Sequence, residues 1–391
     1  METQSNPRDG ARGVRGIDVA GLERQLAATW RETAAGEGAA GKSGVTRVCV
    51  ANLIVYSPSA SGREGLGVLL EEVAAQTPSR VIMLQVERGG EPRLDAHVST
   101  RCRPALKGRR QLCGEQITIE AGGRMTESVA SAVEPLLVPD IAAFLWWQDI
   151  PNREDKLFSR LVEMVDRVVI DSAAFDRPRE DLGRVAGLVA GRGEELRLSD
   201  LNWGRLTSWR SIVADFWDVP EYREHLDALD RVEIEYEPSA IAPAEVAAQA
   251  LLTAGWLSSR LGWRPAGTFV EGRNESRVGF TSRGGGIDLV LRASGEAGGG
   301  RIRRVVLGGA GAAEFRAALG SGGATLETSA RIGDALHVGR VVAYEAKSEG
   351  RRLGRELGIL ARDEVYEQAV TAASRLTGTG AAGEDRVGKI S

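Results

Sequence analysis

The stretch AAFLWWQDIPNREDKLFSRLVEMVDRVVID, residues 142–171, decides the fold class because it contains a complete strand–helix–strand unit. Its two apolar runs, AAFLWW and RVVI, are typical of buried strands, and a helix is predicted between them at 154–165. Strands joined through a helix lie parallel in one sheet. The stretch therefore predicts an α/β fold. Asp171 ends the second strand, where a polar side chain either faces a ligand crevice or caps the next segment together with Ser172.

The same alternation of strands and helices extends toward the N-terminus. LDAHVSTRC and QLCGEQITIEA are predicted to be two more exposed strands, joined by the basic turn RPALKGRR. The other elements predicted on this side are helices at 19–35, 62–76 and 126–137, and strands at 46–56 and 80–87.

The segment GEGAAGKS, residues 36–43, matches the phosphate-loop pattern of P-loop nucleotide-binding proteins. A phosphate loop requires a strand before it and a helix after it, because the helix N-terminus supplies the amides and the dipole that hold phosphate. Here a predicted helix precedes the segment and a predicted strand follows it. We therefore interpret the segment, including Lys42, as a Gly/Ala linker.

Toward the C-terminus, a helix is predicted within 198–217, capped by Ser199 or Asp200. Its apolar side chains recur at three- and four-residue steps and predict a buried face: Leu206, Trp209, Val213 and Phe216. A strand at 231–237 follows, then the segment PSAIAPAE, interpreted as a domain junction, and a helix at 243–261.

The second half changes character. Short alternating segments separated by Gly-rich turns predict an antiparallel sheet: RVGFTS, IDLVLRAS, RIRRVVLGG, ATLETSAR and VGRVVAYEA. LGGAGAAEF, 307–315, is read as a strand, glycines and then a helix, and it lacks the spacing of a dinucleotide-binding loop. One long last helix is predicted at about 349–376.

The predicted fold is therefore a mostly parallel N-terminal sheet with crossover helices, followed by a smaller α+β domain with antiparallel strands. We expect the following division: 1–44, a flexible tail, a helix and a Gly/Ala linker; 45–238, the α/β domain; 239–376, the α+β domain; 377–391, a disordered tail.

Composition excludes several classes of protein. Hydrophobic residues make up 42% and charged residues 27% of the 391 residues, as in globular proteins, and the net charge of −4 does not suggest nucleic acid. No apolar stretch suits a secretory signal or a membrane span. Cys49, Cys102 and Cys113 form no disulfide framework and no zinc pattern. We expect a cytoplasmic protein with reduced thiols.

No catalytic, cofactor or metal constellation stands out. The three histidines lie far apart in the sequence, and there is no G-x-S-x-G around a serine. Residues 260–362 carry 17 Arg and Lys against 10 Asp and Glu, which fits either an anion-binding face or solvated surface. Almost all the basic residues are Arg, a bias that also follows from genome base composition.

Four phrases in sequence order resemble the OpcA family, the glucose-6-phosphate dehydrogenase assembly proteins of actinobacteria and photosynthetic bacteria. They are VPDIAAFLWW (138–147), DRVVIDSA (166–173), LNWGRLTSWR (201–210) and LGRELGILARDEVYEQAV (353–370). NLIVY and RCRPALKGRRQLCGEQITI agree more weakly. The chain departs from the family pattern at Ala142 and Ala143, in place of a proline, and at Ala361, in place of a glycine.

The resemblance implies a non-catalytic protein that binds glucose-6-phosphate dehydrogenase and favours its active oligomer. It singles out the positions shared with the family motifs, as core or as partner-binding residues: Asp140, Trp146, Trp147, Asp171, Asn202, Trp203, Arg205, Trp209, Arg210, Arg362, Asp363 and Tyr366. In photosynthetic members the effect is tied to thioredoxin, which makes Cys102 and Cys113, on the predicted neighbouring strands, possible redox residues and thioredoxin a possible partner.

One alternative from another class remains open at this point. A nucleotide- or sugar-phosphate-binding enzyme would use the crevice near Asp171 together with the basic second half. Loss of nucleotide binding on Lys42→Ala would favour it.

Overall fold

The computed structural model describes residues 17–38, 46–47, 49–58, 65–102, 112–192, 196–309, 313–344 and 347–378. Lys42, the Gly/Ala linker predicted at 36–44 from residue 39 onward, and the predicted tails before residue 17 and after residue 378 lie outside these residues. The chain divides into two compact units: Met1–Asp149 with Arg153–Val168, and Ile150–Asn152 with Val169–Ser391. Among the described residues, no helix is both long enough and apolar enough to cross a bilayer.

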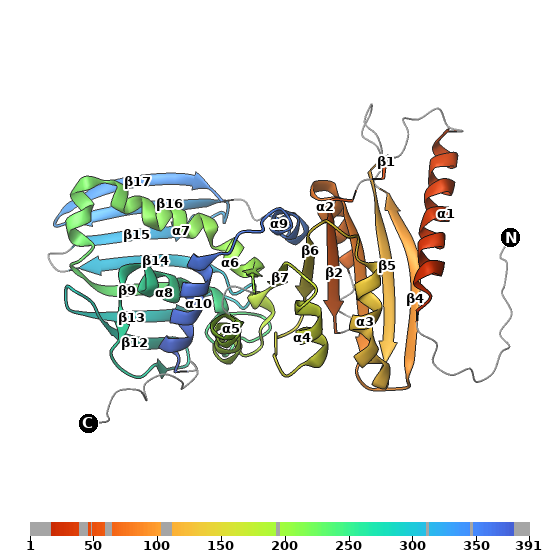
Figure 1. The fold of residues 1–391 in the computed structure, drawn as a ribbon. Coiled ribbons are helices and arrows are strands. Elements are labelled where there is room, and N and C mark those ends of the chain that lie inside the picture. The colour runs from red at the N-terminus through yellow and green to blue at the C-terminus, as the bar shows by residue number, and fades with distance from the viewer. Residues whose placement is uncertain are drawn as a thin grey trace, which may run out of the picture. The chain divides into compact units, whose positions relative to one another are not determined.

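The first unit is built on a mostly parallel sheet (Figure 1). Within this unit the strands follow the order β1-β5-β3-β2-β6, and all these neighbours are parallel. β4 lies antiparallel to β5, as predicted for the pair of exposed strands. The bounds are β1 Thr46–Arg47, β2 Ala51–Ser57, β3 Ser79–Glu87, β4 Arg93–Cys102, β5 Leu112–Gly122 and β6 Ala143–Trp147.

The helices of this unit are α1 Val19–Gly38, α2 Leu66–Gln76, α3 Val129–Val133 and α4 Lys156–Val162. The predicted helix at 126–137 is a short α-helix between two 3-10 segments, Gly123–Ser128 and Glu134–Leu136. α1 is tied to the sheet through Arg80, which bonds to Glu23 at 2.7 Å and to Glu115 at 2.9 Å. The Trp30 indole N–H donates to the same Glu115 at 2.9 Å. Helix and sheet therefore share one charge cluster, in which Arg80 and Glu115 are buried and Glu23 is partly exposed.

The second unit carries a nine-stranded sheet in the order β10-β12-β13-β9-β14-β15-β16-β17, with β11 paired to β12. Every pairing is antiparallel except β9 with β13. The bounds are β9 Leu229–Tyr236, β10 Arg264–Pro265, β11 Val270–Glu271, β12 Glu275–Thr281, β13 Gly286–Ala293, β14 Ile302–Gly309, β15 Ala313–Leu319, β16 Thr325–Ile332 and β17 Ala335–Ala343.

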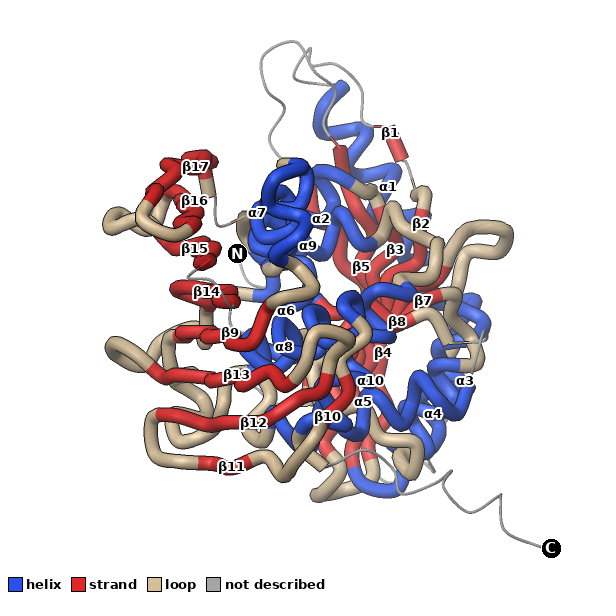
Figure 2. Tube along the Cα trace, turned by 90° about the vertical axis from the view of Figure 1, so that its left-hand side faces the viewer, coloured by secondary structure: helices blue, strands red, loops and turns tan. Residues whose placement is uncertain are grey.

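Helices lie on one side of this nine-stranded sheet (Figure 2). They are α5 Pro178–Arg192, α6 Leu201–Arg205, α7 Thr207–Ala214, α8 Ala248–Leu261, α9 Glu349–Glu356 and α10 Glu364–Leu376. The short strand β8, Leu198–Asp200, precedes α6, and β7, Arg167–Ile170, lies where the chain passes from one unit to the other. 3-10 turns occupy Ser172–Ala174, Asp215–Asp218 and Pro220–His225. The predicted apolar stripe Leu206, Trp209, Val213 and Phe216 is buried throughout.

The fold class predicted from the sequence is confirmed, and several details differ. α1 continues to Gly38, into the Gly/Ala linker that was predicted to begin at residue 36. β9 pairs with β13 and β14 of the second half, so the predicted boundary at 238–239 falls inside the second unit, which is the larger one.

The segment at 313–319 is a strand and not the predicted helix. Its Ala-rich composition favours a helix locally, but Ala313, Phe315 and Ala317 alternate into the core, and the strand hydrogen-bonds to both neighbours. The predicted last helix is two helices, because Asp363 starts α10 afresh by accepting a hydrogen bond from the Tyr366 amide at 2.9 Å.

Candidate functional site

The motif residues of the first unit lie in its interior or at a turn. Trp146 and Trp147 end β6, and each exposes 1% of its surface. Trp147 stacks on Tyr56, with ring centroids 3.7 Å apart, and meets Phe158 of α4 edge-on at 5.0 Å. Of the two roles that the family motifs allow for this pair, core or partner-binding, the structure places both side chains in the core, and Trp147 packs against helix α4. Asp140 has a φ of 62°, a left-handed conformation that Asp tolerates better than most residues, in the turn before β6.

Cys102 and Cys113 are placed opposite each other by the backbone. They are register partners in the β4–β5 pair. Directly opposed positions of an antiparallel pair have Cα atoms about 4.5–5.5 Å apart, which lies within the range of Cα separations that disulfides span. The prediction that the two cysteines lie on neighbouring strands is confirmed at the level of the backbone.

The motif residues of the second unit converge on one polar network. Asp171, just after β7, receives two parallel hydrogen bonds from the Arg205 guanidinium, at 2.6 and 2.8 Å. It also accepts from the Ala173 amide at 3.1 Å, so it caps the following turn. The capping role considered from the sequence is therefore present. Two-pronged Arg–carboxylate pairing fixes geometry as well as charge, so the pair holds α6 against the end of β7.

Asp200 is the buried hub of this network. Its carboxylate accepts from the Ser172 amide at 3.0 Å, the Ser172 hydroxyl at 2.6 Å and the Asn202 amide at 2.8 Å. The Tyr366 hydroxyl lies 3.5 Å from the same carboxylate. Burial, assisted by the negative charge of Asp171, raises the pKa of Asp200 to about 6. One carboxylate thus joins the end of β7, the start of α6 and helix α10.

Asn202 carries the network toward the nine-stranded sheet. Its side-chain amide donates to the Ser172 hydroxyl at 3.1 Å, and its carbonyl oxygen accepts from Gln249 of α8 at 2.8 Å. Gln249 in turn accepts from the backbone amide of Ile302 at 3.2 Å. Asn202 and Gln249 are both buried, and this chain of bonds satisfies their polar atoms inside the core.

Trp203 joins the third and fourth motif phrases. Its indole N–H donates to Asp363 at 2.9 Å, and its ring lies 5.7 Å from that of Tyr366. The Arg210 guanidinium stacks 3.5 Å above the Trp203 ring. Burial lowers the pKa of Arg210 to about 10, although the charge of Asp363 acts in the opposite direction. Trp209, by contrast, is a core residue that meets Tyr344 edge-on at 6.5 Å.

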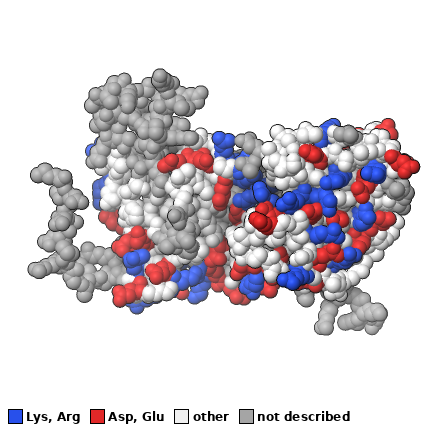
Figure 3. Space-filling view, turned by 180° about the vertical axis from the view of Figure 1, so that it is seen from behind, with Lys and Arg blue, Asp and Glu red and all other residues white. Residues whose placement is uncertain are grey.

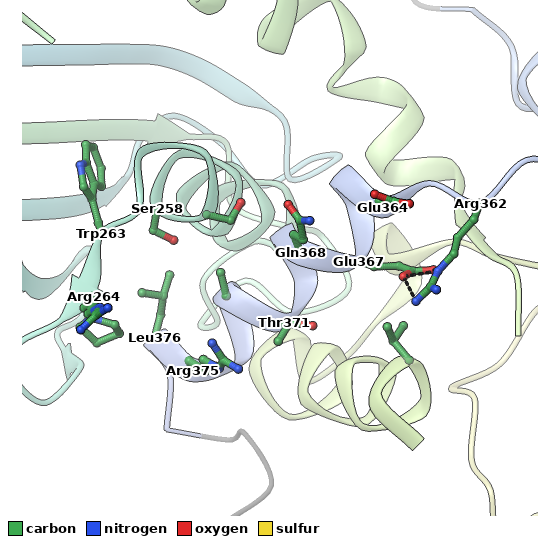
Figure 4. A pocket seen from close by; sticks show the side chains of 15 residues that line it. Ser258, Trp263, Arg264, Arg362, Glu364, Glu367, Gln368, Thr371, Arg375 and Leu376 are labelled. Carbon is green, nitrogen blue, oxygen red and sulfur yellow. Dashed lines mark hydrogen bonds and ion pairs between the residues drawn. The ribbon is translucent and has the colours of Figure 1, made fainter. Parts of the chain in front are cut away.

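A pocket of about 680 Å³ lies along the outer face of α10, between it, α5 and the end of α8 (Figure 4). Arg362, the remaining motif residue, lies at one end and pairs with Glu367 at 2.6 and 2.7 Å. Arg264 and Arg375 lie near the other end, with Gln368 and Thr371 between them. The lining of the pocket is mixed, since apolar side chains such as Trp263 and Leu376 lie beside these polar ones.

These contacts describe a network that holds segments together. The donors and acceptors around Asp200 and Asn202 are paired with one another, whereas the buried Nε–H of Arg210 has no acceptor among the described residues. Asp200 has the pKa of an acid–base group, but the bonds from Ser172, Asn202 and Tyr366 surround it. Within the described part of the chain, no three His, Cys, Asp or Glu side chains come together as a metal site. The arrangement is suited to fixing the positions of β7, α6, α8 and α10.

Sequence reasoning identified the outer members of the network and missed its centre. Asp171, Asn202, Trp203, Arg205, Asp363 and Tyr366 were predicted as motif residues. Asp200 was expected only as a helix cap, and Ser172 only as a partner in capping. Gln249 was not singled out, although a lone amide within the apolar run AAQALLTAGW is a recognisable signal of a buried hydrogen bond.

Comparison with known families gives the decisive observation. Two family models, described as the N-terminal and the C-terminal domain of a "Glucose-6-phosphate dehydrogenase subunit", match residues 70–187 and residues 196–370 respectively. The chain belongs to the OpcA family. All the network residues from Asp200 to Tyr366 lie within the second match.

Curated OpcA relatives are similar over half of the chain. A protein of Synechococcus elongatus, named as an OpcA protein of the OxPP cycle, is 32% identical over 219 residues, which is 56% of this chain and 47% of the relative. A Nostoc punctiforme protein of the same name is 36% identical over 199 residues, 50% of this chain and 41% of the relative. The aligned part thus spans less than half the length of these two OpcA proteins.

Solved structures resemble the OpcA chain only distantly. An NAD binding oxidoreductase from Klebsiella pneumoniae aligns over 84% of this chain and 96% of its own, with a TM-score of 0.47 and 8% identity. A UDP-N-acetylglucosamine 3-dehydrogenase from Acidithiobacillus ferrooxidans gives a TM-score of 0.42 at 12% identity, over 84% and 97% of the two chains. Similarity at this level supports no conclusion about function.

Proposed function

We propose that this OpcA-family chain is a non-catalytic subunit that binds glucose-6-phosphate dehydrogenase and favours its active oligomer. It would thereby support NADPH supply through the oxidative pentose phosphate pathway. The observation that carries the proposal is the match to both dehydrogenase-subunit domains, across 70–187 and 196–370. The names of the relatives, which refer to the OxPP cycle, agree with it.

The geometry of the motif residues supports a binding role. The family phrases supply Asp171, Arg205, Asn202, Trp203 and Asp363, and the structure engages each of them in a contact that holds one element to another. A network of this kind keeps the elements that it joins in fixed positions, as a partner-binding surface requires. Its carboxylates, Asp171 and Asp200, are hydrogen-bonded to other residues of the chain.

Activation without a catalytic group is a matter of linkage. A subunit that binds the active oligomer more tightly than the inactive form shifts the population toward the active one. A tenfold difference in affinity supplies about 1.4 kcal/mol, and a hundredfold difference supplies about 2.7 kcal/mol. Redox control through thioredoxin acting on Cys102 and Cys113 is a further part of the proposal, and their register supports it.

The test is a titration of glucose 6-phosphate against the dehydrogenase of the same organism, with and without the chain, following NADPH formation. We expect a lower half-saturation or a higher maximal rate, a shift of the dehydrogenase toward a larger oligomer in size-exclusion chromatography, and no NADPH from the chain alone. No effect with excess chain, in both reducing and oxidising buffer, would refute the proposal.

A matched pair of variants tests whether the network supports binding. Arg205→Lys keeps the charge but loses the two parallel bonds to Asp171. Arg277→Lys makes the same change on an exposed strand, at an arginine paired with Glu275. We expect Arg205→Lys to weaken stimulation of the dehydrogenase and Arg277→Lys to retain it.

The alternative enzyme would place its ligand beside Asp171. Both carboxylate oxygens of Asp171 are engaged by Arg205, so a ligand there would have to compete with an ion pair already formed. No contact in the described residues favours this second function over the first.

A further inference from the structure

The face of the nine-stranded sheet that points away from helices α5 to α10, called the helix-free face below, carries many charged side chains. Acidic and basic side chains alternate across its strands (Figure 2, Figure 3). Figure 3 shows Arg and acidic side chains interspersed over the second unit on the side away from the helices. One row crosses four strands by ion pairs between neighbouring arginines and acidic residues: Arg277, Glu275, Arg292, Glu233, Arg304 and Glu235. The charges of this row are therefore matched by their neighbours.

A β-bulge on β14 breaks the regular alternation at one end of this row. The pairing of β14 with β9 shifts register between Ile302 and Arg304, so Arg303 is an extra residue. In a regular strand, Arg303 and Arg304 would point to opposite faces. Here Arg303 is exposed, and Arg304 bonds to Glu233 and Glu235 on the helix-free face, while Ile302 and Val305 are buried. Because of the bulge, the consecutive residues Arg303 and Arg304 both lie on the helix-free face.

A third arginine and a glycine turn complete a pocket of about 420 Å³. Arg316 of β15 lines this pocket together with Arg303 and Arg304, and it shares a face with Arg304 because Arg304 is opposite Ala318, two residues along. The turn at 320–323 forms the other wall. The pocket is large enough for a small metabolite and much larger than a phosphate group alone.

The donors in this pocket are in excess of the acceptors. Among the described residues, Arg303 and Arg316 have no ion-pair partner, whereas Glu235, the acidic residue of the lining, is already bonded to Arg304 and Ser294. The buried Nε–H of Arg304 has no hydrogen-bond acceptor within the described part of the chain. A buried donor without an acceptor is destabilising, so a ligand oxygen that reached this N–H would stabilise the site.

The turn adds backbone donors to the side-chain donors. Its ends are closed by bonds from the Gly320 amide to the Thr325 carbonyl at 2.9 Å and from the Gly323 amide to the Gly320 carbonyl at 2.8 Å. The amides of Ser321 and Gly322 between them donate to no described residue. Amides of a turn and planar guanidinium groups are the donors that proteins use for phosphate oxygens.

We propose that Arg303, Arg304, Arg316 and the turn at 320–323 form a binding site for a phosphomonoester group of a small molecule. Arg303 and Arg316 supply positive charge, which balances the negative charge of the bound phosphate group. Arg304, which is held in place by its ion pairs with Glu233 and Glu235, forms the floor of the site. This site lies on the face opposite the α10 helix and is separate from the network around Asp200.

Isothermal titration calorimetry of the full chain tests the site directly and does not involve the dehydrogenase. The probes are inorganic phosphate, a hexose 6-phosphate and the corresponding unphosphorylated hexose. We expect saturable binding of the phosphorylated sugar, tighter than that of inorganic phosphate, and no binding of the hexose. Binding of inorganic phosphate alone would overturn the assignment to an ester and leave a site for free phosphate.

Variants separate a built site from diffuse positive charge. Arg303→Gln and Arg316→Gln each remove a charged donor from an exposed position, and each should weaken binding at least about tenfold. Arg331→Gln, on the neighbouring strand β16 and outside the pocket lining, is the matched control and should leave affinity unchanged. Equal weakening by Arg331→Gln and Arg316→Gln, or the absence of saturable binding, would overturn the proposal.

Discussion

Replacing Asp200 by Asn should change how the stability of the chain depends on pH. Asp200 is fully buried, and burial raises its pKa from the ordinary value of 3.8 to about 6. In Asn the amide oxygen can still accept from the Ser172 and Asn202 amides, which now bond to one carboxylate oxygen. The substitution therefore removes a titrating charge and preserves the two backbone contacts.

The sign follows from proton linkage. The folded state binds the Asp200 proton up to about pH 6, and the unfolded state releases it near pH 3.8. Between these values the folded state holds more protons, so the contribution of Asp200 to stability falls as pH rises. At about 1.4 kcal/mol per pH unit, the full penalty is about 3 kcal/mol and is reached above pH 6. It is relieved as the solution is acidified.

The assay is urea unfolding of the two proteins at a series of pH values from about 4 to about 8. The unfolding free energy of Asp200→Asn minus that of the parent should increase over this range by about 2.5 kcal/mol, because a small part of the penalty is already present at pH 4, and it should level off above about pH 7. Asp230→Asn, at an exposed position of β9, controls for the loss of one negative charge. A difference that stays constant over this range would refute the reasoning, because Asp200 would then carry no linked proton.

Two other predictions test packing and register. A Cβ on Gly255 of α8 would lie 2.1 Å from the Ala369 carbonyl oxygen, so Gly255→Ala should lower the unfolding free energy by about 2 kcal/mol or more. Gly204→Ala is the control, because nothing lies within 4 Å of a Cβ at that position, and it should leave the unfolding free energy unchanged. Equal urea midpoints for the two variants would contradict this prediction. Mild oxidation should change the mobility of the chain on a non-reducing gel through a Cys102–Cys113 disulfide, and Cys102→Ser should abolish the change. The same mobility at every redox potential would show that the opposed backbone positions do not form the bond.

The interior of the molecule was largely readable from the sequence where a pattern is local. The four-residue apolar stripe from Leu206 to Phe216 predicted a buried helical face, and the β-branched run at 167–170 predicted a buried strand. Phosphate-loop chemistry at 36–43 was set aside because of the order of elements alone: α1 begins before the segment and runs into it as far as Gly38, and strands follow the segment.

Contacts between distant segments could not be read in this way. The Ala-rich segment at 313–319 favours a helix by itself and becomes a strand because β14 and β16 supply hydrogen bonds on both sides. Asp200 could be recognised as a cap, but its pKa depends on its burial in the folded chain. One of the residues packed against its carboxylate is Tyr366, which lies 166 residues away in the sequence. The extra residue at Arg303 is visible only in the register between β9 and β14.

The sequence by itself determined the family, the two kinds of sheet and most helices, because residue identity and short periodicities carry that information. Tertiary structure alone decided which motif residues share a network and that both Trp146 and Trp147 are core residues. It also decided which arginines of the helix-free face have no acidic partner among the described residues. The physical reason is that burial, pKa and strand register are properties of pairs of segments, and a linear pattern specifies each segment without its partner.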